Sequence, residues 1–219
     1  MRSFFITIAI LCSLGLAAQP ARFSFATDLG LQRSFRKDQR YWAIGHTVHG
    51  HFHFTDRQGL YGSFAYFSAG RFRHQFTATA KSATTTPQNF SFYNNTEMRF
   101  KLISLGWKQY VRGRYNVSDN WNLYGSAGFG LMLGRVTNEQ DPAVDTSLYE
   151  VPVYRGMAHF KRLTFDLALG WEVPIGGEVY FYTEGRLFVP TTDYPSRHLL
   201  VNENAPLAAA AVAGIRILF

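Results

Sequence analysis

The chain has 219 residues, of which 47% are hydrophobic, 16% aromatic and 17% charged, and its formal net charge is +7. Soluble domains usually carry about a quarter charged residues, so this composition disfavours an ordinary soluble enzyme. A helical membrane protein would show apolar runs of roughly 20 residues, and the one apolar run here, at the N-terminus, is shorter. Many aromatic residues and few, evenly spread charges instead suit strands with one apolar and one polar face.

Residues 1–18 predict a secretory signal peptide. A basic start that includes Arg2 precedes an apolar core over 4–16, and small residues follow for cleavage, which we expect just before Gln19. The single cysteine, Cys12, lies in this segment. The mature domain, 19–219, is therefore expected to have no disulfide, no cysteine-ligated metal and no thiol nucleophile.

From Arg22 onward, apolar and polar residues alternate in segments of about ten residues, which is typical of a transmembrane β-barrel. In the second segment Trp42, Ile44 and Phe52 alternate with smaller or polar residues. We predict an all-β fold, an antiparallel up-and-down transmembrane barrel of eight strands. The expected strands are 23–32, 42–54, 60–72, 99–115, 122–133, 163–173, 179–189 and 208–219.

The connections between these strands alternate in length. Short turns are expected near 55–59, 116–121 and 174–177, and longer connections near 34–40, 74–98, 137–160 and 190–206. Outer-membrane barrels have short periplasmic turns and longer extracellular loops. The pattern therefore predicts an integral outer-membrane protein with both termini in the periplasm. Eight strands enclose a lumen that side chains can fill.

The last strand carries the most specific pattern, because alternate positions are small or apolar and the chain finishes on an aromatic residue: Ala209, Ala211, Ala213, Ile215, Ile217, Phe219. With the signal peptide and the segment 116–131, Asn-Val-Ser-Asp-Asn-Trp-Asn-Leu-Tyr-Gly-Ser-Ala-Gly-Phe-Gly-Leu, the chain resembles the small OmpA/OmpX-like outer-membrane barrels. The resemblance is one of architecture over the whole mature chain. It implies that Phe219 belongs to the signal read by the barrel-assembly machinery, and it brings no motif specific to one function.

The polar faces of the predicted strands point titratable side chains into the lumen. Charge is costly on a lipid-facing surface but can be paired inside, so we expect an ion-pair network there. The predicted members are Asp28, His49, His51, His53, Arg71, Arg73, Asp166, Glu172, Glu184, Arg186 and Arg216. Two interpretations stay open, a structural plug and a gated or selective pore.

The lumen histidines are expected to be polar residues bonded to their neighbours. Two histidines that are neighbours along the strand would lie about 6.8 Å apart and could chelate one metal ion, whereas the outer two would be about 13 Å apart. No catalytic residue and no cofactor is expected.

The preferred function is a non-enzymatic outer-membrane barrel that contributes to envelope integrity or surface interaction, with at most a narrow channel. The alternatives are a small passive pore and a lipid A-modifying enzyme. For the enzyme, His74, His159, Ser196 and His198 are candidates near extracellular strand ends, but their spacing defines no triad. A soluble lipocalin-like barrel would carry its apolar faces inside.

The expected partners follow from location and charge. Outer-membrane lipids should contact the barrel wall, and lipopolysaccharide phosphates suit a chain of positive net charge. The barrel-assembly machinery is expected to act during biogenesis. Nucleic acid is not expected for a secreted chain, and no surface ligand is indicated.

Overall fold

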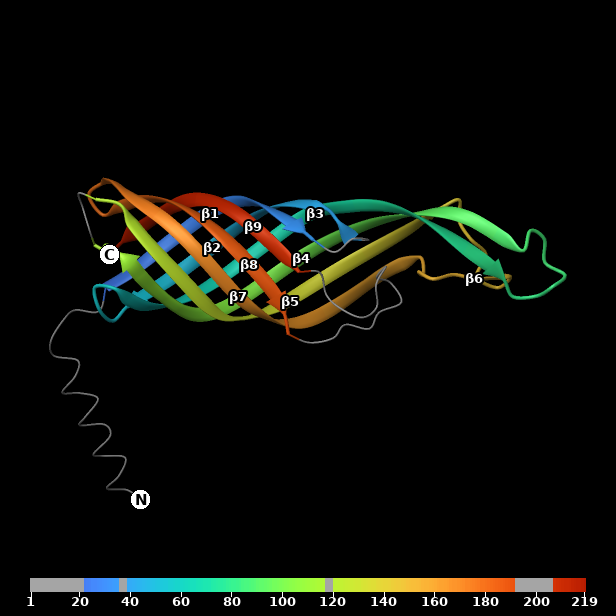
Figure 1. Ribbon diagram of the computed structural model, residues 1–219, viewed down its shortest axis with the longest axis horizontal. Coiled ribbons are helices and arrows are strands. Elements are labelled where there is room, and N and C mark those ends of the chain that lie inside the picture. Colours follow the sequence, from blue (N-terminus) through green and yellow to red (C-terminus); the bar gives the residue numbers. More distant parts are fainter. Residues whose placement is uncertain (1–21, 36–38, 117–119, 192–206) are drawn as a thin grey trace, which may run out of the picture.

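The computed structural model describes residues 22–35, 39–116, 120–191 and 207–219. The predicted signal peptide, residues 1–18, lies outside the described residues. In the part that is described, no helix is long and apolar enough to cross a membrane. The strands, shown in Figure 1, are β1 (Arg22–Ser34), β2 (Trp42–His53), β3 (Gln58–Ala80), β4 (Asn89–Arg112), β5 (Asn122–Asp141), β6 (Tyr149–Glu150), β7 (Gly156–Gly176), β8 (Val179–Pro190) and β9 (Ala208–Leu218).

Eight of these strands close into an antiparallel barrel. Around the wall they follow the order β1, β2, β3, β4, β5, β7, β8 and β9, and β9 returns to β1. The closing seam runs from the pair Ser24 and Leu218 to the pair Ser34 and Ala208. The two-residue β6 stands outside the barrel and pairs only with the end of β3. The prediction of a closed, all-β, eight-stranded antiparallel barrel is confirmed.

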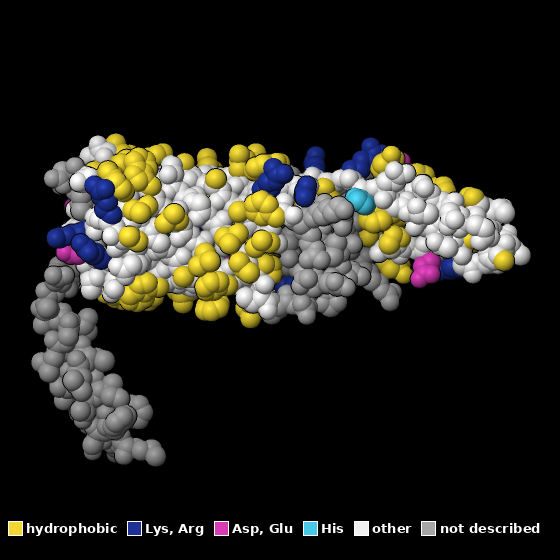
Figure 2. Space-filling view, in the orientation of Figure 1, with side chains coloured by type: hydrophobic (Ala, Val, Ile, Leu, Met, Phe, Trp, Pro, Cys, Tyr) yellow, Lys and Arg dark blue, Asp and Glu magenta, His cyan; other side chains and the backbone are white. Residues whose placement is uncertain are grey.

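The wall of the barrel is apolar outside and largely polar inside. Phe129 and Leu29 point outward and are 67% and 66% exposed, whereas Glu172 points inward and is 0% exposed. Clusters of apolar side chains are spread over the barrel portion of the visible surface, and charged groups lie at its two ends and on the projection (Figure 2). Such a surface is abnormal for a soluble monomer but is what lipid contact requires. The faces are therefore opposite to those of a lipocalin-like barrel.

Four neighbouring strands are much longer than the membrane needs. β3, β4, β5 and β7 have 23, 24, 20 and 21 residues, while β1, β2, β8 and β9 have 13, 12, 12 and 11. A transmembrane strand takes about 9–11 residues. The surplus forms a sheet that continues past the barrel (Figure 1). We call residues 70–80, 89–98 and 136–141 the projecting sheet, with the start of β7 at its base.

The projecting sheet replaces much of two predicted loops. The expected connection 74–98 is a continuous hairpin of β3 and β4, paired from Gly70 with Met98 to Thr79 with Asn89. One face of the hairpin carries a small apolar core that the segment around β6 covers. Its buried members are Ala78, Phe92, Tyr149 and Val151. The projection is thus a folded element with a core of its own.

Arg71 and Arg73 do not lie in the lumen, and their prediction as lumen residues is wrong. On β3, Phe67 pairs with Phe100 but Gly70 pairs with Met98, so two residues of β3 oppose one residue of β4. Such a β-bulge inverts the alternation of side chains beyond it. Arg71 and Arg73 consequently point outward, with side chains 75% and 56% exposed.

The two described ends of the barrel chain lie together. Arg22 opens β1 and Leu218 closes β9 at the end of the barrel that carries the short turns, and the projecting sheet leaves the opposite end (Figure 1). Phe219 donates its backbone N–H to the carbonyl of Phe23 over 2.9 Å, and the two rings are 6.5 Å apart. The final aromatic residue is therefore on the outer surface of the wall.

Candidate functional site

Glu172 forms the centre of a buried charge cluster near the short turns. Its carboxylate accepts hydrogen bonds from Arg216 over 2.9 and 3.1 Å. It also accepts from Asn122 over 2.9 Å and from Tyr110 over 3.1 Å, and the Lys108 ammonium lies 3.9 Å away. A buried carboxylate is tolerated when cations and further donors satisfy its oxygens, as they do here.

A second cluster surrounds Arg186 in the middle of the lumen. Its guanidinium reaches Asp28 and Glu184, each over 2.5 Å, and donates to the Thr47 hydroxyl over 2.7 Å. The Tyr182 hydroxyl donates to the same Asp28 oxygen over 2.7 Å. This one arginine therefore connects side chains from β1, β2 and β8 across the interior.

The three histidines of β2 all point inward but do not form a chelating set. The ring centroids of His49 and His51 are 5.6 Å apart with planes at 10°, and those of His51 and His53 are 6.1 Å apart at 16°. Ring nitrogens hold their lone pairs in the ring plane, so stacked rings do not direct them at one point. Among the described residues, no three His, Cys, Asp or Glu side chains are placed to hold a metal ion.

Each end of the histidine stack has a polar neighbour. His49 Nε2 lies 3.0 Å from Asp28 Oδ2 and 2.8 Å from Arg186 Nη2, and this nitrogen can donate to the first or accept from the second. His53 Nε2 lies 2.9 Å from Ser24 Oγ. These contacts tie β2 to β1 at both ends of the stack, and to Arg186 on β8 at the His49 end.

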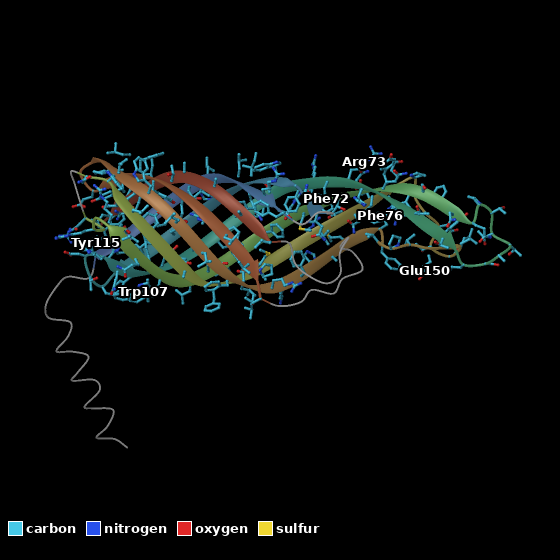
Figure 3. The ribbon with its side chains drawn as sticks, viewed as in Figure 1. Phe72, Arg73, Phe76, Trp107, Tyr115 and Glu150 are labelled. Atoms are coloured by element: carbon cyan, nitrogen blue, oxygen red, sulfur yellow. The ribbon has the colours of Figure 1, made fainter. Side chains whose placement is uncertain are left out.

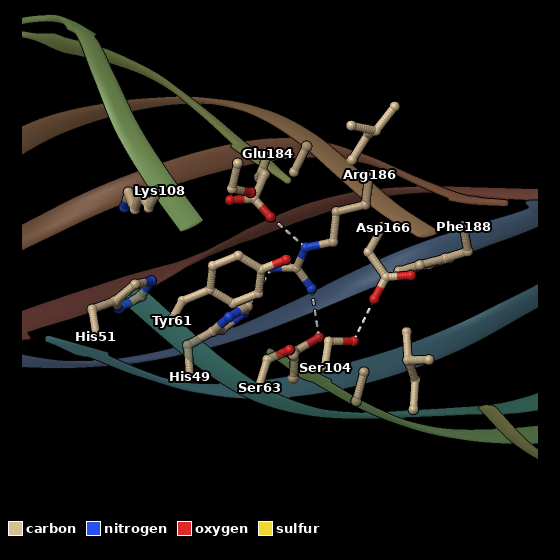
Figure 4. Close-up of a pocket in the computed structure, with 16 residues that line it drawn as sticks. His49, His51, Tyr61, Ser63, Ser104, Lys108, Asp166, Glu184, Arg186 and Phe188 are labelled. Atoms are coloured by element: carbon tan, nitrogen blue, oxygen red, sulfur yellow. Dashed lines mark hydrogen bonds and ion pairs between the residues drawn. The ribbon is translucent and has the colours of Figure 1, made fainter. Parts of the chain in front are cut away.

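Asp166 is held by hydroxyl groups. It accepts hydrogen bonds from Ser104 and, over 2.7 Å, from Thr164. Asp166 and Ser104 line a cavity of about 30 Å³ beside Arg186 and Tyr61, which Figure 4 shows. A water molecule needs roughly 10–15 Å³ of such space, so the cavity has room for about two waters. It is far too small for a solute path.

An aromatic layer closes the lumen between the Arg186 cluster and the projecting sheet. Phe67 on β3 and Phe188 on β8 meet edge to face with centroids 6.1 Å apart, and these strands stand four positions apart around the eight-stranded wall. Phe100 and Phe160 also meet, at 6.1 Å. The buried members of the layer are Tyr41, Phe67, Met98, Phe100, Met132, Phe160 and Phe188. The contact of Phe67 with Phe188 spans the diameter of the barrel.

Nine of the eleven predicted network residues lie in the lumen, and they separate into distinct groups. Asp28, His49, Glu184 and Arg186 share one cluster, Glu172 and Arg216 form another, and Asp166 is bound by hydroxyls. The sequence interpretation missed Lys108 and Arg162, which are 3% and 1% exposed. The alternation of β4 and β7 contained that signal, since both residues follow outward-facing ones.

The described lumen is close to electroneutral. Asp28, Asp166, Glu172 and Glu184 supply four carboxylates, and Lys108, Arg162, Arg186 and Arg216 supply four cations. An ion-selective pore would carry an excess of one sign along its path. The arrangement instead pairs charges locally and fills the space between strands.

The charges on the projecting sheet are organised differently, as exposed pairs. Arg71 and Arg99 both reach Glu97, over 3.4 and 2.5 Å, and Arg73 lies 3.8 Å from Asp141. We call the outward-facing apolar side chains of the barrel wall, such as Leu29 and Phe129, the apolar belt. Glu97 lies beyond this belt, and the hydrogen bond from Arg99 holds the pKa of its carboxyl below the ordinary value. Figure 3 shows Arg73 on the projection together with Phe72 and Phe76, far from Trp107 at the short-turn end.

The enzyme candidates are not assembled into a site. His74 lies on the inner face of β3 in the projecting sheet, and His159 lies on the outer face of β7. Strands β4 and β5 separate them. Ser196 and His198 lie outside the described residues.

The geometry defines a class of fold: a small outer-membrane β-barrel of eight strands with a filled lumen. Solved structures of this kind resemble it. Neisserial surface protein A matches with a TM-score of 0.52 and 10% identity, and the match covers 90% of this chain and 97% of that protein. The attachment invasion locus protein Ail of Yersinia pestis, solved in complex with the heparin analogue sucrose octasulfate, matches over 92% and 100% with a TM-score of 0.51 and 10% identity. At this identity the likeness concerns the fold. No family model matches the chain, and no curated protein matches its sequence.

Proposed function

We propose that this protein is a non-enzymatic integral protein of the bacterial outer membrane that contributes to envelope integrity and presents its projecting sheet for interaction at the cell surface. The observation that carries the proposal is the contact between Phe67 and Phe188 across the lumen. Among the described residues, these rings and the charge clusters fill the lumen, which disfavours transport. The barrel's remaining distinctive feature is the folded sheet beyond the apolar belt.

The orientation follows from the general asymmetry of such barrels. Short turns face the periplasm and longer elements face outward. Under this rule both termini are periplasmic and the projecting sheet is extracellular. Residues 1–18 then act as the cleaved export signal, and Phe219, exposed beside Phe23, is available to the barrel-assembly machinery.

The projecting sheet offers an open strand edge as well as a surface. β2 pairs with β3 only as far as Ser68, and β6 pairs only with Thr79 and Ala80. Between these points no described strand covers that edge of β3. An uncovered edge presents backbone donors and acceptors to which another extended chain can pair.

The alternatives of pore and enzyme have less support. A passive pore needs a continuous path, whereas two small cavities among the described lumen residues measure about 30 and 10 Å³. A lipid A-modifying enzyme needs a nucleophile and a base in contact, and His74 and His159 lie on different faces of different strands. Outer-membrane lipids and lipopolysaccharide remain the proposed partners of the wall.

The first experiment separates membranes from cells that make the full chain and compares boiled with unboiled samples on a gel. We expect the protein in the outer membrane with a heat-dependent shift in mobility. Planar bilayer recordings should then show no steady conductance, and mass spectrometry of lipid A should show unchanged acylation. Steady openings would support the pore, and altered acylation would support the enzyme.

Surface interaction is tested with a shortened hairpin. Phe72 pairs with Thr96, so these two residues can be joined by an Asn-Gly turn that removes the outer part of the projecting sheet. The first probe is heparin-coated wells, because Ail was solved with a heparin analogue. Cells with the full chain should adhere more than cells with the shortened chain at equal surface amounts. Equal adhesion would remove the projecting sheet as the contact surface for this probe.

A further inference from the structure

A row of basic side chains crosses the outer wall at the base of the projecting sheet. Arg99 on β4 pairs directly with Arg135 on β5, and Arg135 pairs with His159 on β7. One step further toward the barrel, Lys101 and Lys161 flank Leu133. All five polar groups are exposed and, with Tyr66 and Leu133, line one groove on the outer surface. We call Arg99, Lys101, Arg135, His159 and Lys161 the basic row.

The spacing of the basic row concentrates positive charge. Neighbouring strands are about 4.8 Å apart, so the row spans roughly 10 Å over three strands. Like charges directly opposite each other on neighbouring strands are unfavourable. Within the described part of the chain, Arg99 is paired with Glu97, but no carboxylate forms an ion pair with Lys101, Arg135 or Lys161. The positive charge of the basic row would therefore be stabilised by an anion from outside the chain.

The position of the basic row relative to the apolar belt identifies the kind of anion. Directly below it, toward the short-turn end, Ile103, Leu131 and Leu163 form the next outward rung, and they are 50%, 38% and 52% exposed. Apolar side chains continue below this rung through Leu105 and Phe129. A ligand that satisfies both surfaces must carry phosphate groups at the level of the basic row and acyl chains along the belt.

We infer that the basic row binds the phosphorylated sugar headgroup of an outer-leaflet glycolipid, with its acyl chains on the apolar rungs of β4, β5 and β7. The inference rests on the proposed function, because it needs the belt in a bilayer with the projecting sheet outside. Arginine and lysine suit phosphate because their N–H groups form charge-assisted hydrogen bonds with its oxygens. Glu97 is expected to weaken phosphate binding, since its carboxylate forms an ion pair with the Arg99 guanidinium over 2.5 Å.

The test uses the full chain, refolded into phosphatidylcholine nanodiscs and checked for its heat-dependent gel shift. Binding of fluorescent diphosphoryl lipid A is compared with binding of the same lipid after removal of its phosphates. Arg135→Gln/Lys161→Gln should weaken binding of the diphosphoryl form at least tenfold, since each charged contact contributes on the order of a tenfold change. The matched control Arg71→Gln/Arg73→Gln removes the same charge from the projecting sheet and should change binding less than twofold. Glu97→Gln should strengthen binding by freeing Arg99.

The possible outcomes decide between sources of the anion and between hypotheses. If the dephosphorylated lipid binds as well as the diphosphoryl form, or the basic-row variant binds like the wild type, the inference is overturned. The proposed outer-membrane barrel is not contradicted by either result. If millimolar inorganic phosphate displaces the lipid completely, the row is a free-anion site and the glycolipid assignment fails. If the chain does not insert into the nanodiscs with a heat-dependent shift in gel mobility, the proposed function is contradicted, and the inference that rests on it fails as well.

Discussion

The ring of Phe160 lies over Gly134, its directly paired neighbour on β5, and fills the space that a side chain there would need. Gly45 stands in the same relation to Phe67, its partner on β3. Both rings belong to the aromatic layer. Large inward rings in this narrow barrel are thus accommodated by glycines on the adjacent strand.

Gly134→Ala should destabilise the barrel by about 1–3 kcal/mol, the usual cost of an added group in a filled core. The added Cβ would overlap the Phe160 ring and force the aromatic layer to shift. Unfolding in lipid vesicles with guanidinium, followed by the gel shift, measures the effect. Gly185→Ala is the matched control because a Cβ there would meet nothing within 4 Å. Equal stability of the two variants would contradict the packing argument.

Glu172→Gln should cost about 3–5 kcal/mol of unfolding free energy, because it leaves Arg216 and Lys108 buried without their carboxylate. Arg216→Met should cost a similar amount. The double variant should lose less unfolding free energy than the sum of the two single variants, because it leaves neither Glu172 nor Arg216 as a buried charge without its partner. Strict additivity in equilibrium unfolding would show that the cluster does not act as a unit.

The control for Glu172 is an exposed ion pair at the same end of the barrel. Asp56 and Arg114 lie 3.3 Å apart with side chains 42% and 58% exposed. Asp56→Asn should change stability by no more than about 1 kcal/mol, because solvent screens exposed pairs. A large effect there would mean that charge at the turns, and not burial, dominates.

The sequence was enough to predict the barrel because alternation is enforced by lipid on one side and a filled lumen on the other. His49, Glu172 and Arg216 could be placed inside for that reason. Their partition into separate clusters could not be predicted, because it depends on how strands distant in sequence meet across the lumen. Glu172 and Arg216, for example, come from β7 and β9, which are not neighbours.

The projecting sheet escaped prediction for a related reason. Once a strand leaves the membrane, its outer face no longer has to be apolar, and the pattern weakens. Residues 74–80 and 89–98 contain Thr, Asn and Ser at many outward positions, such as Thr77 and Ser91, and resemble loops. Only their pairing in three dimensions identifies them as strands.

Removal of the aromatic layer should open the barrel. Phe67→Ala/Phe188→Ala deletes a ring contact that spans the diameter, and we expect it to produce conductance in planar bilayers where the wild type shows none. Phe129→Ala, on the outward face, is the matched control and should show no conductance. The gel shift confirms that each variant is folded, since loss of a core ring costs about 3–5 kcal/mol. A silent, folded double variant would place the seal in the charge clusters below.

The bulge on β3 decides which face of the projecting sheet carries Arg71 and Arg73. Deleting Ala69 leaves one residue of β3 opposite one residue of β4 between the pairs Phe67 with Phe100 and Gly70 with Met98. Regular alternation then continues in the register that these pairs already have, so both arginines stay outward and Phe72 stays inward. Each side chain keeps its environment, and the projecting sheet should therefore keep its packing above an intact barrel.

Limited trypsin digestion of the protein in vesicles tests this. The projection should resist cleavage in the wild type and in the Ala69 deletion, because its arginines sit in paired strands in both, and the heat-dependent shift should persist in both. Deletion of Ala83, in the exposed connection between β3 and β4, is the control for chain shortening and should remain resistant. Cleavage of the Ala69 deletion within 71–99 would mean that the pairing of β3 with β4 needs the bulge itself. The outward position of Arg71 and Arg73 would then depend on the bulge as well as on their ion pairs with Glu97 and Asp141.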